Sequence, residues 1–194
     1  MVAGTLPSGI RLVPQKHGSA ERRTLDVTID RLSGSLGSLL LLWARIERSA
    51  RAEVTHPNGS LPKSAHGIAA LLDNWKSKVV AGQPATSLCP SLATVLRAEL
   101  QAPLDVRNGL CHGLIGISMA DEEMPAKLRW ELNGKERSIS WEELQASFEW
   151  LSKVPRALSI ISNLSLERVG SRAIDNTENR EWWLTEFALR LPND

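Results

Sequence analysis

The segment from Arg107 to His112 places a fixed cation, an amide and a titratable imidazole within six residues. Arg107 offers a planar guanidinium that matches the geometry of a phosphate. His112 carries the side-chain type that titrates closest to neutral pH, so it can act as general base or general acid. Asn108 can donate to a phosphate oxygen or orient the imidazole. Cleavage of an RNA phosphodiester without a metal requires groups of these kinds.

Helix geometry sets how these side chains could meet. On an ideal helix, Asn108 and His112 lie one turn apart on the same face, whereas Arg107 and His112 are separated by about 140°. Arg107 must therefore reach around the helix, or the helix must be distorted, or Arg107 must serve a site on a second subunit. The motif holds a single imidazole, whereas the reaction needs two proton transfers, and a twofold axis would supply a second imidazole.

Three glycines lie in and directly after the same segment at spacings of four and three, namely Gly109, Gly113 and Gly116. Glycine inside a helix costs roughly 1 kcal/mol relative to alanine. We therefore expect a packing reason for them, and predict that they form a smooth strip on which another helix approaches.

Composition limits the remaining classes of function. The chain has 194 residues, 42% hydrophobic and 23% charged, with a formal net charge of +1. These values are typical of a globular protein with a core, and any contact with nucleic acid must come from a local patch. The two cysteines are not spaced along the chain as metal ligands usually are. No apolar run is long enough to cross a bilayer. A cytoplasmic protein with no metal, no cofactor and no membrane contact is therefore predicted.

Apolar periodicity predicts four main helices and a short last one. The first spans about 25–53, with a seam of apolar residues at spacings of three and four. The second is predicted over about 65–81. The third begins near Pro90, is broken or kinked at Pro103, and resumes over 104–119 with the motif. The fourth begins at Ser140, and the short last helix spans about 180–191. Ser140 and Glu143 fit a capping box. The two seam registers are Leu25, Leu32, Leu39 and Ile46, and Ile29, Leu36, Trp43 and Ala50.

Alternating residues around Asn133-Gly134 predict one β-hairpin at about 127–139. The predicted fold is therefore an all-α bundle of four to five helices with a small inserted β-hairpin. The predicted organisation is an irregular N-terminal arm over 1–24, a helical bundle over 25–170, and a Trp-rich C-terminal helix over 171–194.

The motif resembles that of the HEPN superfamily, in which Arg is followed after four to six residues by His. Here four residues intervene, with Asn directly after the Arg and Gly113 after the His. The resemblance implies a helical bundle, a homodimer with a composite site, and metal-independent ribonuclease activity in toxin–antitoxin, defence or RNA-processing systems. It assigns catalytic roles to Arg107, Asn108 and His112, and suggests Glu47 as an acidic residue on an earlier helix. A subgroup has a modified Tyr two positions after the His, where this chain has Leu114.

A second interpretation stays open beside the ribonuclease. The motif could consist of a surface arginine and a histidine bonded to a backbone carbonyl, and Glu47 could be a solvated charge on a helix flank. The chain would then be a non-catalytic helical interaction or nucleotide-binding module. The partners expected under the first hypothesis are a second copy, an RNA substrate and a cognate antitoxin protein.

Overall fold

The computed structural model describes residues 27–56, 59–84, 86–120, 125–132, 134–164 and 171–192. The predicted N-terminal arm over 1–24 lies outside the described residues. The described residues form two compact units. Unit 1 contains those of 1–42 and 102–149, and unit 2 contains those of 43–101 and 150–194. The boundaries fall inside the first and the fifth helix and after the first residue of the fourth.

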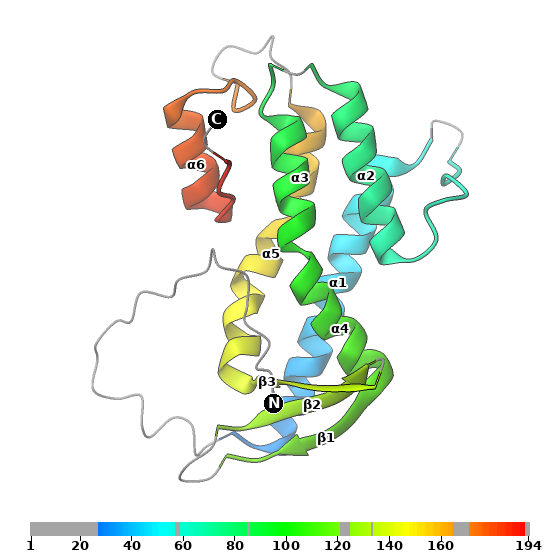
Figure 1. Cartoon of the computed structure of the whole chain (residues 1–194), viewed down its shortest axis with the longest axis vertical. Helices are drawn as coiled ribbons and strands as arrows, with labels where there is room; N and C mark the ends of the chain where they lie inside the picture. The colour runs from blue at the N-terminus through cyan, green and yellow to red at the C-terminus, as the bar shows by residue number, and fades with distance from the viewer. Residues whose placement is uncertain are drawn as a thin grey trace. The chain divides into compact units, whose positions relative to one another are not determined.

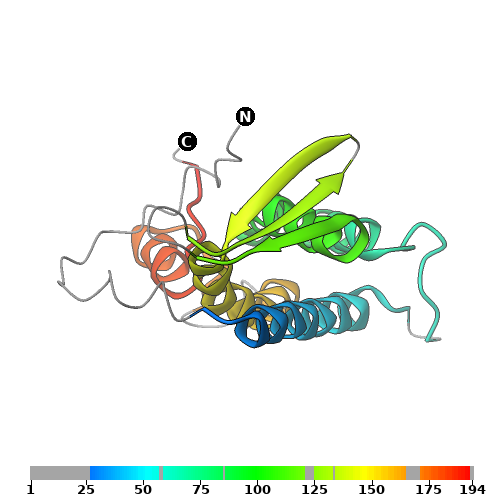
Figure 2. The same ribbon diagram turned by 90° about the horizontal axis from the view of Figure 1, so that it is seen from below.

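Six helices and three strands occupy the described residues. The helices are α1 (Ile29–Val54), α2 (Ile68–Gly82), α3 (Cys89–Glu99), α4 (Gln101–Gly113), α5 (Trp141–Asn163) and α6 (Thr177–Phe187). The strands β1 (Leu114–Ser118), β2 (Lys127–Leu132) and β3 (Lys135–Ser140) form one antiparallel sheet in the order β1-β2-β3 (Figures 1 and 2).

The predicted all-α, HEPN-like bundle with a single hairpin is therefore wrong. The two hairpin strands are present, and Gly134 has the positive φ of 71° that a tight turn requires. The error concerns residues 114–118, predicted as helix, which instead form β1 and pair with β2. Ile115 and Ile117 are β-branched and follow the helix-ending Gly113, which favours an extended chain once a partner strand is present.

Local signals mark some of the helix ends, although the last helix, predicted over about 180–191, spans Thr177–Phe187. Ser140 and Glu143 form the reciprocal bonds of the predicted capping box: the Ser140 amide donates to the Glu143 carboxylate at 2.9 Å, and the Glu143 amide donates to the Ser140 hydroxyl at 3.1 Å. Pro103 lies in the first turn of α4, where a missing backbone N–H removes no helical bond. The break predicted at Pro103 accordingly falls earlier, at Leu100.

Unit 1 packs one face of the sheet on helices. Residues of β2 alternate between buried and less buried positions, as the hairpin pattern predicts. Ser35 of α1 accepts hydrogen bonds from the Trp141 indole at 3.1 Å and from Gln145 at 2.7 Å, which ties α1 to α5 within this unit. Its core consists of Leu32, Leu39, Leu104, Leu110, Leu128, Trp130, Ile139 and Leu144.

Unit 2 is helical, and α2 and α3 lie side by side in it (Figure 1). Three tryptophans, Trp43, Trp75 and Trp183, are among its fully buried side chains. Trp75 donates to the Ser162 hydroxyl at 2.9 Å, and Trp183 donates to the Arg172 carbonyl at 3.0 Å. Buried indoles thus join α2 to α5 and α6 to the segment before it.

The α1 seam is buried along most of its length, with Leu32, Leu39 and Ile46 at 2% exposure or less. Ile29, the first residue of α1 and expected in the same seam, is instead 60% exposed.

Two exposed glycines inside α1 allow a stability prediction. A Cβ built on Gly34 or on Gly37 meets nothing within 4 Å among the described residues. Gly37→Ala is therefore expected to stabilise the protein by about 0.5–1 kcal/mol, because alanine restricts the unfolded backbone and adds no clash. Thermal unfolding of the variant beside wild type measures this, and a lower melting temperature would mean that another group occupies this face.

Candidate functional site

The motif lies at the C-terminal end of α4, directly before β1. Arg107 and Asn108 are half-buried, His112 is exposed in the last turn, and the helix ends at Gly113. The imidazole is therefore open to a ligand from solvent. An imidazole sealed in the core, which a purely structural histidine would favour, is not observed.

Arg107 bends toward Asn108. Its Nη1 donates to the Asn108 side-chain Oδ1 at 2.9 Å. Asn108 stands one turn before His112 on the same helix face, so this bond draws the guanidinium toward that face. The angular separation that the sequence implied between Arg107 and His112 is thus reduced by a side-chain bond within one chain. The amide group of Asn108 keeps its Nδ2 donors for another acceptor.

The Arg107 Nε is buried and has no hydrogen-bond partner among the described residues. A buried donor without a partner costs on the order of 1–3 kcal/mol. The terminal Nη atoms are therefore the part of this guanidinium that can meet a ligand.

Two glycines allow β2 to approach α4 closely. A Cβ on Gly109 would overlap the Trp130 indole, and a Cβ on Gly113 would overlap the backbone carbonyl of Glu131. Trp130 is 3% exposed, and its Nε1 is buried without a partner in the described part of the chain. The close approach expected from the glycine spacing is present, but a strand makes it and not a helix. This contact holds the end of α4 in place behind the motif.

The electrostatics of a helix C-terminus bear on what the site can bind. The unpaired carbonyls of the last turn favour cations and disfavour anions by about 0.3–1 kcal/mol at an exposed surface. A phosphate beside His112 therefore needs a compensating positive charge. Arg107 is the charged member of the motif that can supply it.

Glu47, the acidic residue suggested by the family resemblance, belongs to unit 2. Its carboxylate accepts from Arg51 Nη2 at 2.9 Å, one turn along α1, and both side chains are substantially exposed. An exposed pair at this spacing is an ordinary feature of a helix surface. A role for Glu47 at the site stays a prediction.

Sequence reasoning missed the strand that follows the motif. Three large apolar side chains of β1 are exposed, Leu114 at 41%, Ile115 at 50% and Ile117 at 37%, and so is Met119 directly after it, at 41%. The signal was the Ile-Gly-Ile alternation, which fits a strand as well as a helix. The segment next to His112 carries no charged residue from Gly113 to Ala120.

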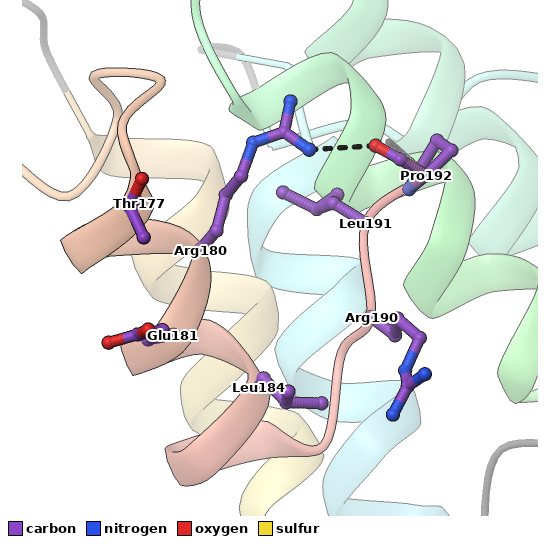
Figure 3. A pocket seen from close by; sticks show the side chains of 7 residues that line it. All are labelled: Thr177, Arg180, Glu181, Leu184, Arg190, Leu191 and Pro192. Atoms are coloured by element: carbon purple, nitrogen blue, oxygen red, sulfur yellow. Dashed lines mark hydrogen bonds between the residues drawn. The ribbon is translucent and has the colours of Figure 1, made fainter. Parts of the chain in front are cut away.

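A pocket of about 720 Å³ lies in unit 2 between α6 and the chain that follows it (Figure 3). One wall carries Thr177, Arg180, Glu181 and Leu184, and the other carries Arg190, Leu191 and Pro192. Arg180 donates to the Pro192 carbonyl at 2.7 Å and pairs with Asp175, and this bond lowers the pKa of Asp175. Arg180 is engaged in these contacts, whereas Thr177, Glu181 and Arg190 are the other polar residues of the lining.

In the described ranges, no three His, Cys, Asp or Glu side chains are grouped so that they could hold a metal ion. No described helix combines the length and the apolar character needed to span a membrane. No family model, no curated protein and no solved structure matches this chain.

Proposed function

We propose that this chain is a metal-independent endoribonuclease whose site is built from Arg107, Asn108 and His112. One observation carries the proposal: the Arg107 guanidinium is bonded to Asn108, one helical turn before an exposed imidazole. A phosphate held by Arg107 on this face would lie next to a group that can move a proton. The resemblance of the six-residue motif to the HEPN superfamily belongs to the proposal, as do an RNA substrate and a cognate antitoxin protein.

The reaction is a transesterification within the RNA. A base takes the proton of the 2′-hydroxyl, the 2′-oxygen bonds to phosphorus, and the bond from phosphorus to the 5′-oxygen breaks. The leaving 5′-oxygen takes up a proton, so the products carry a 2′,3′-cyclic phosphate and a 5′-hydroxyl. His112 serves one of the two proton transfers. Arg107 stabilises the charge that builds on the phosphate oxygens, and Asn108 orients the guanidinium.

A second candidate, a non-catalytic interaction module, is favoured by the exposed apolar residues of β1. Such residues beside the motif would suit contact with a protein. In that case the arginine and the histidine would border a binding surface and would touch no RNA.

A cleavage assay separates the two candidates. The protein is incubated in excess chelator with an oligonucleotide that carries a single ribonucleotide in a DNA strand, and with the all-DNA strand of the same sequence. We expect cleavage only after the ribonucleotide, with 2′,3′-cyclic phosphate ends. Cleavage of the all-DNA strand, products with 3′-hydroxyl ends, or no cleavage of any RNA at high protein concentration would reject the nuclease. The last result would leave the interaction module.

A further inference from the structure

We propose that Glu131 is a catalytic residue of the same site, the general base that takes the proton of the 2′-hydroxyl while His112 acts as the general acid. This inference rests on the proposed function and deepens it, because it assigns the proton transfer that the motif leaves open. Three observations carry it: the position of Glu131 in the ladder of β1 and β2, its exposure, and the lack of a counter-ion for its carboxylate in the described part of the chain.

Glu131 lies against the residue that follows His112. Leu114 pairs with Trp130 in the antiparallel ladder of β1 and β2. Gly113, one residue earlier, therefore lies opposite Glu131, and the three atoms nearest to a Cβ built on Gly113 are backbone atoms of Glu131. With Cα atoms about 5 Å apart across such a pair and about 3.8 Å apart along the chain, the Cα atoms of His112 and Glu131 are within about 9 Å of each other.

Helix geometry places the imidazole at the border of the face of α4 that contacts β2. Gly109 and Gly113 mark this face, because a Cβ on either one would overlap an atom of β2. On an ideal helix, His112 lies about 60° from Gly109, whereas Arg107 lies about 160° from it. Around this side of the helix, the imidazole therefore lies between Arg107 and the strand that carries Glu131.

The Glu131 carboxylate is exposed and has no counter-ion among the described residues. Glu131 and Glu136 lie directly opposite each other on β2 and β3, and like charges in such a pair destabilise a sheet. Arg129 compensates one of the two, because its Nη1 lies 3.2 Å from the Glu136 Oε1. No described cation compensates Glu131. An arrangement that breaks a local rule of stability without an evident gain is expected mainly at functional sites.

The two side chains suit opposite roles in the reaction. An exposed carboxylate is ordinarily ionised at neutral pH, so it can accept a proton but has none to donate. The unpaired carbonyls at the end of α4 favour a cation, which suits a protonated imidazole. Glu131 is therefore assigned to the proton of the 2′-hydroxyl, and His112 to the proton that the leaving oxygen requires.

The proton transfers then balance within one chain. Glu131 takes the proton of the 2′-hydroxyl as the 2′-oxygen bonds to phosphorus, and His112 gives a proton to the 5′-oxygen as its bond to phosphorus breaks. After the reaction the carboxylate holds one proton more and the imidazole one fewer, and exchange with water restores both. An imidazole from a second copy is not required.

The pH dependence of cleavage tests this assignment. Wild type, assayed in single turnover with excess chelator, is expected to give a bell-shaped profile, in which the acidic limb reports Glu131 and the alkaline limb reports His112. Glu131→Gln should cleave about 10²–10⁴-fold more slowly and should lose the acidic limb, while the alkaline limb remains. Glu131→Asp keeps a carboxylate, so it should cleave faster than Glu131→Gln and should keep both limbs.

A matched control removes the neighbouring carboxylate together with its cation. The ionisable groups that share the exposed face of β2 and β3 with Glu131, or lie in the last two turns of α4, are Lys127, Arg129, Glu136, Arg107, Cys111 and His112. Glu136 is the one other carboxylate in this set. Glu136→Gln combined with Arg129→Gln leaves the net charge unchanged, and it should keep the rate and both limbs of wild type.

Thermal unfolding separates the catalytic role from a structural one. Glu131→Gln removes one of two facing carboxylates, so it should unfold at the temperature of wild type or slightly above it. The proposal for Glu131 is overturned if Glu131→Gln keeps the full rate, or keeps the acidic limb. If His112→Ala is inactive in the same experiment, the nuclease itself still stands. A wild type that cleaves no RNA would end both proposals, so the two failures are distinguishable.

Discussion

His112→Ala is expected to lower the rate of RNA cleavage by about 10²–10⁴-fold, the usual contribution of a positioned general acid or base. The fold should be unaffected, because the side chain is exposed and surface substitutions usually change stability by less than about 0.5 kcal/mol. The melting temperature should therefore stay within about 2 °C of wild type. Single-turnover cleavage in chelator and thermal unfolding, run on the same preparations, measure both quantities.

The neighbouring residue provides the control. Cys111 is also exposed and lies in the same turn of α4, so Cys111→Ala should retain full activity. Arg107→Lys should lose activity as well, because lysine keeps the charge but cannot keep the planar fork that bonds to Asn108. An active His112→Ala preparation would show that another group, or a contaminating nuclease, performs the cleavage.

The helices of this protein could be predicted because their signals are local. The capping box at Ser140 and Glu143 needs only residues that are three positions apart, and both of its hydrogen bonds form. The apolar residues Leu128 and Trp130 alternate with polar ones, which likewise predicted a half-buried strand. Side chains of a strand alternate between its two faces whatever covers the buried face, so this pattern is also local.

The third strand could not be predicted in the same way. Gly109, Gly113 and Gly116 recur at helical spacing, whereas Ile115 and Ile117 alternate as in a strand, so the local pattern supports both structures. Pairing with β2 decides between them, and that contact depends on residues nine to sixteen positions away. Tertiary structure thus ends α4 at Gly113.

The candidate site was predictable in its residue types but not in its geometry. On an ideal helix, Arg107 points away from the face that carries His112. The hydrogen bond from the Arg107 guanidinium to Asn108 depends on the rotamer of the long arginine side chain, which the sequence does not specify. The role suggested for Glu47 came from family resemblance, with no local signal to support it. The structure gives that carboxylate an ordinary partner, Arg51.

Gly113→Ala is expected to destabilise the protein by about 1–3 kcal/mol, the usual cost of forcing an extra group into a packed contact. The new methyl group would overlap the carbonyl oxygen of Glu131, which is backbone and cannot turn aside, so β2 must move by more than an ångström. At about 2–4 °C per kcal/mol, the melting temperature should fall by several degrees.

The same substitution in α1 provides a comparison. Gly37→Ala should raise the melting temperature, whereas Gly113→Ala should lower it. Gly109→Ala should also destabilise, since its methyl group would overlap the Trp130 indole, but a side chain yields more readily than a backbone carbonyl. From most to least stable, we therefore expect Gly37→Ala, wild type, Gly109→Ala and Gly113→Ala. If Gly113→Ala unfolds at the temperature of wild type or above it, β2 does not lie against the end of α4. The strand that supports the motif would then be misplaced, and with it the position of His112.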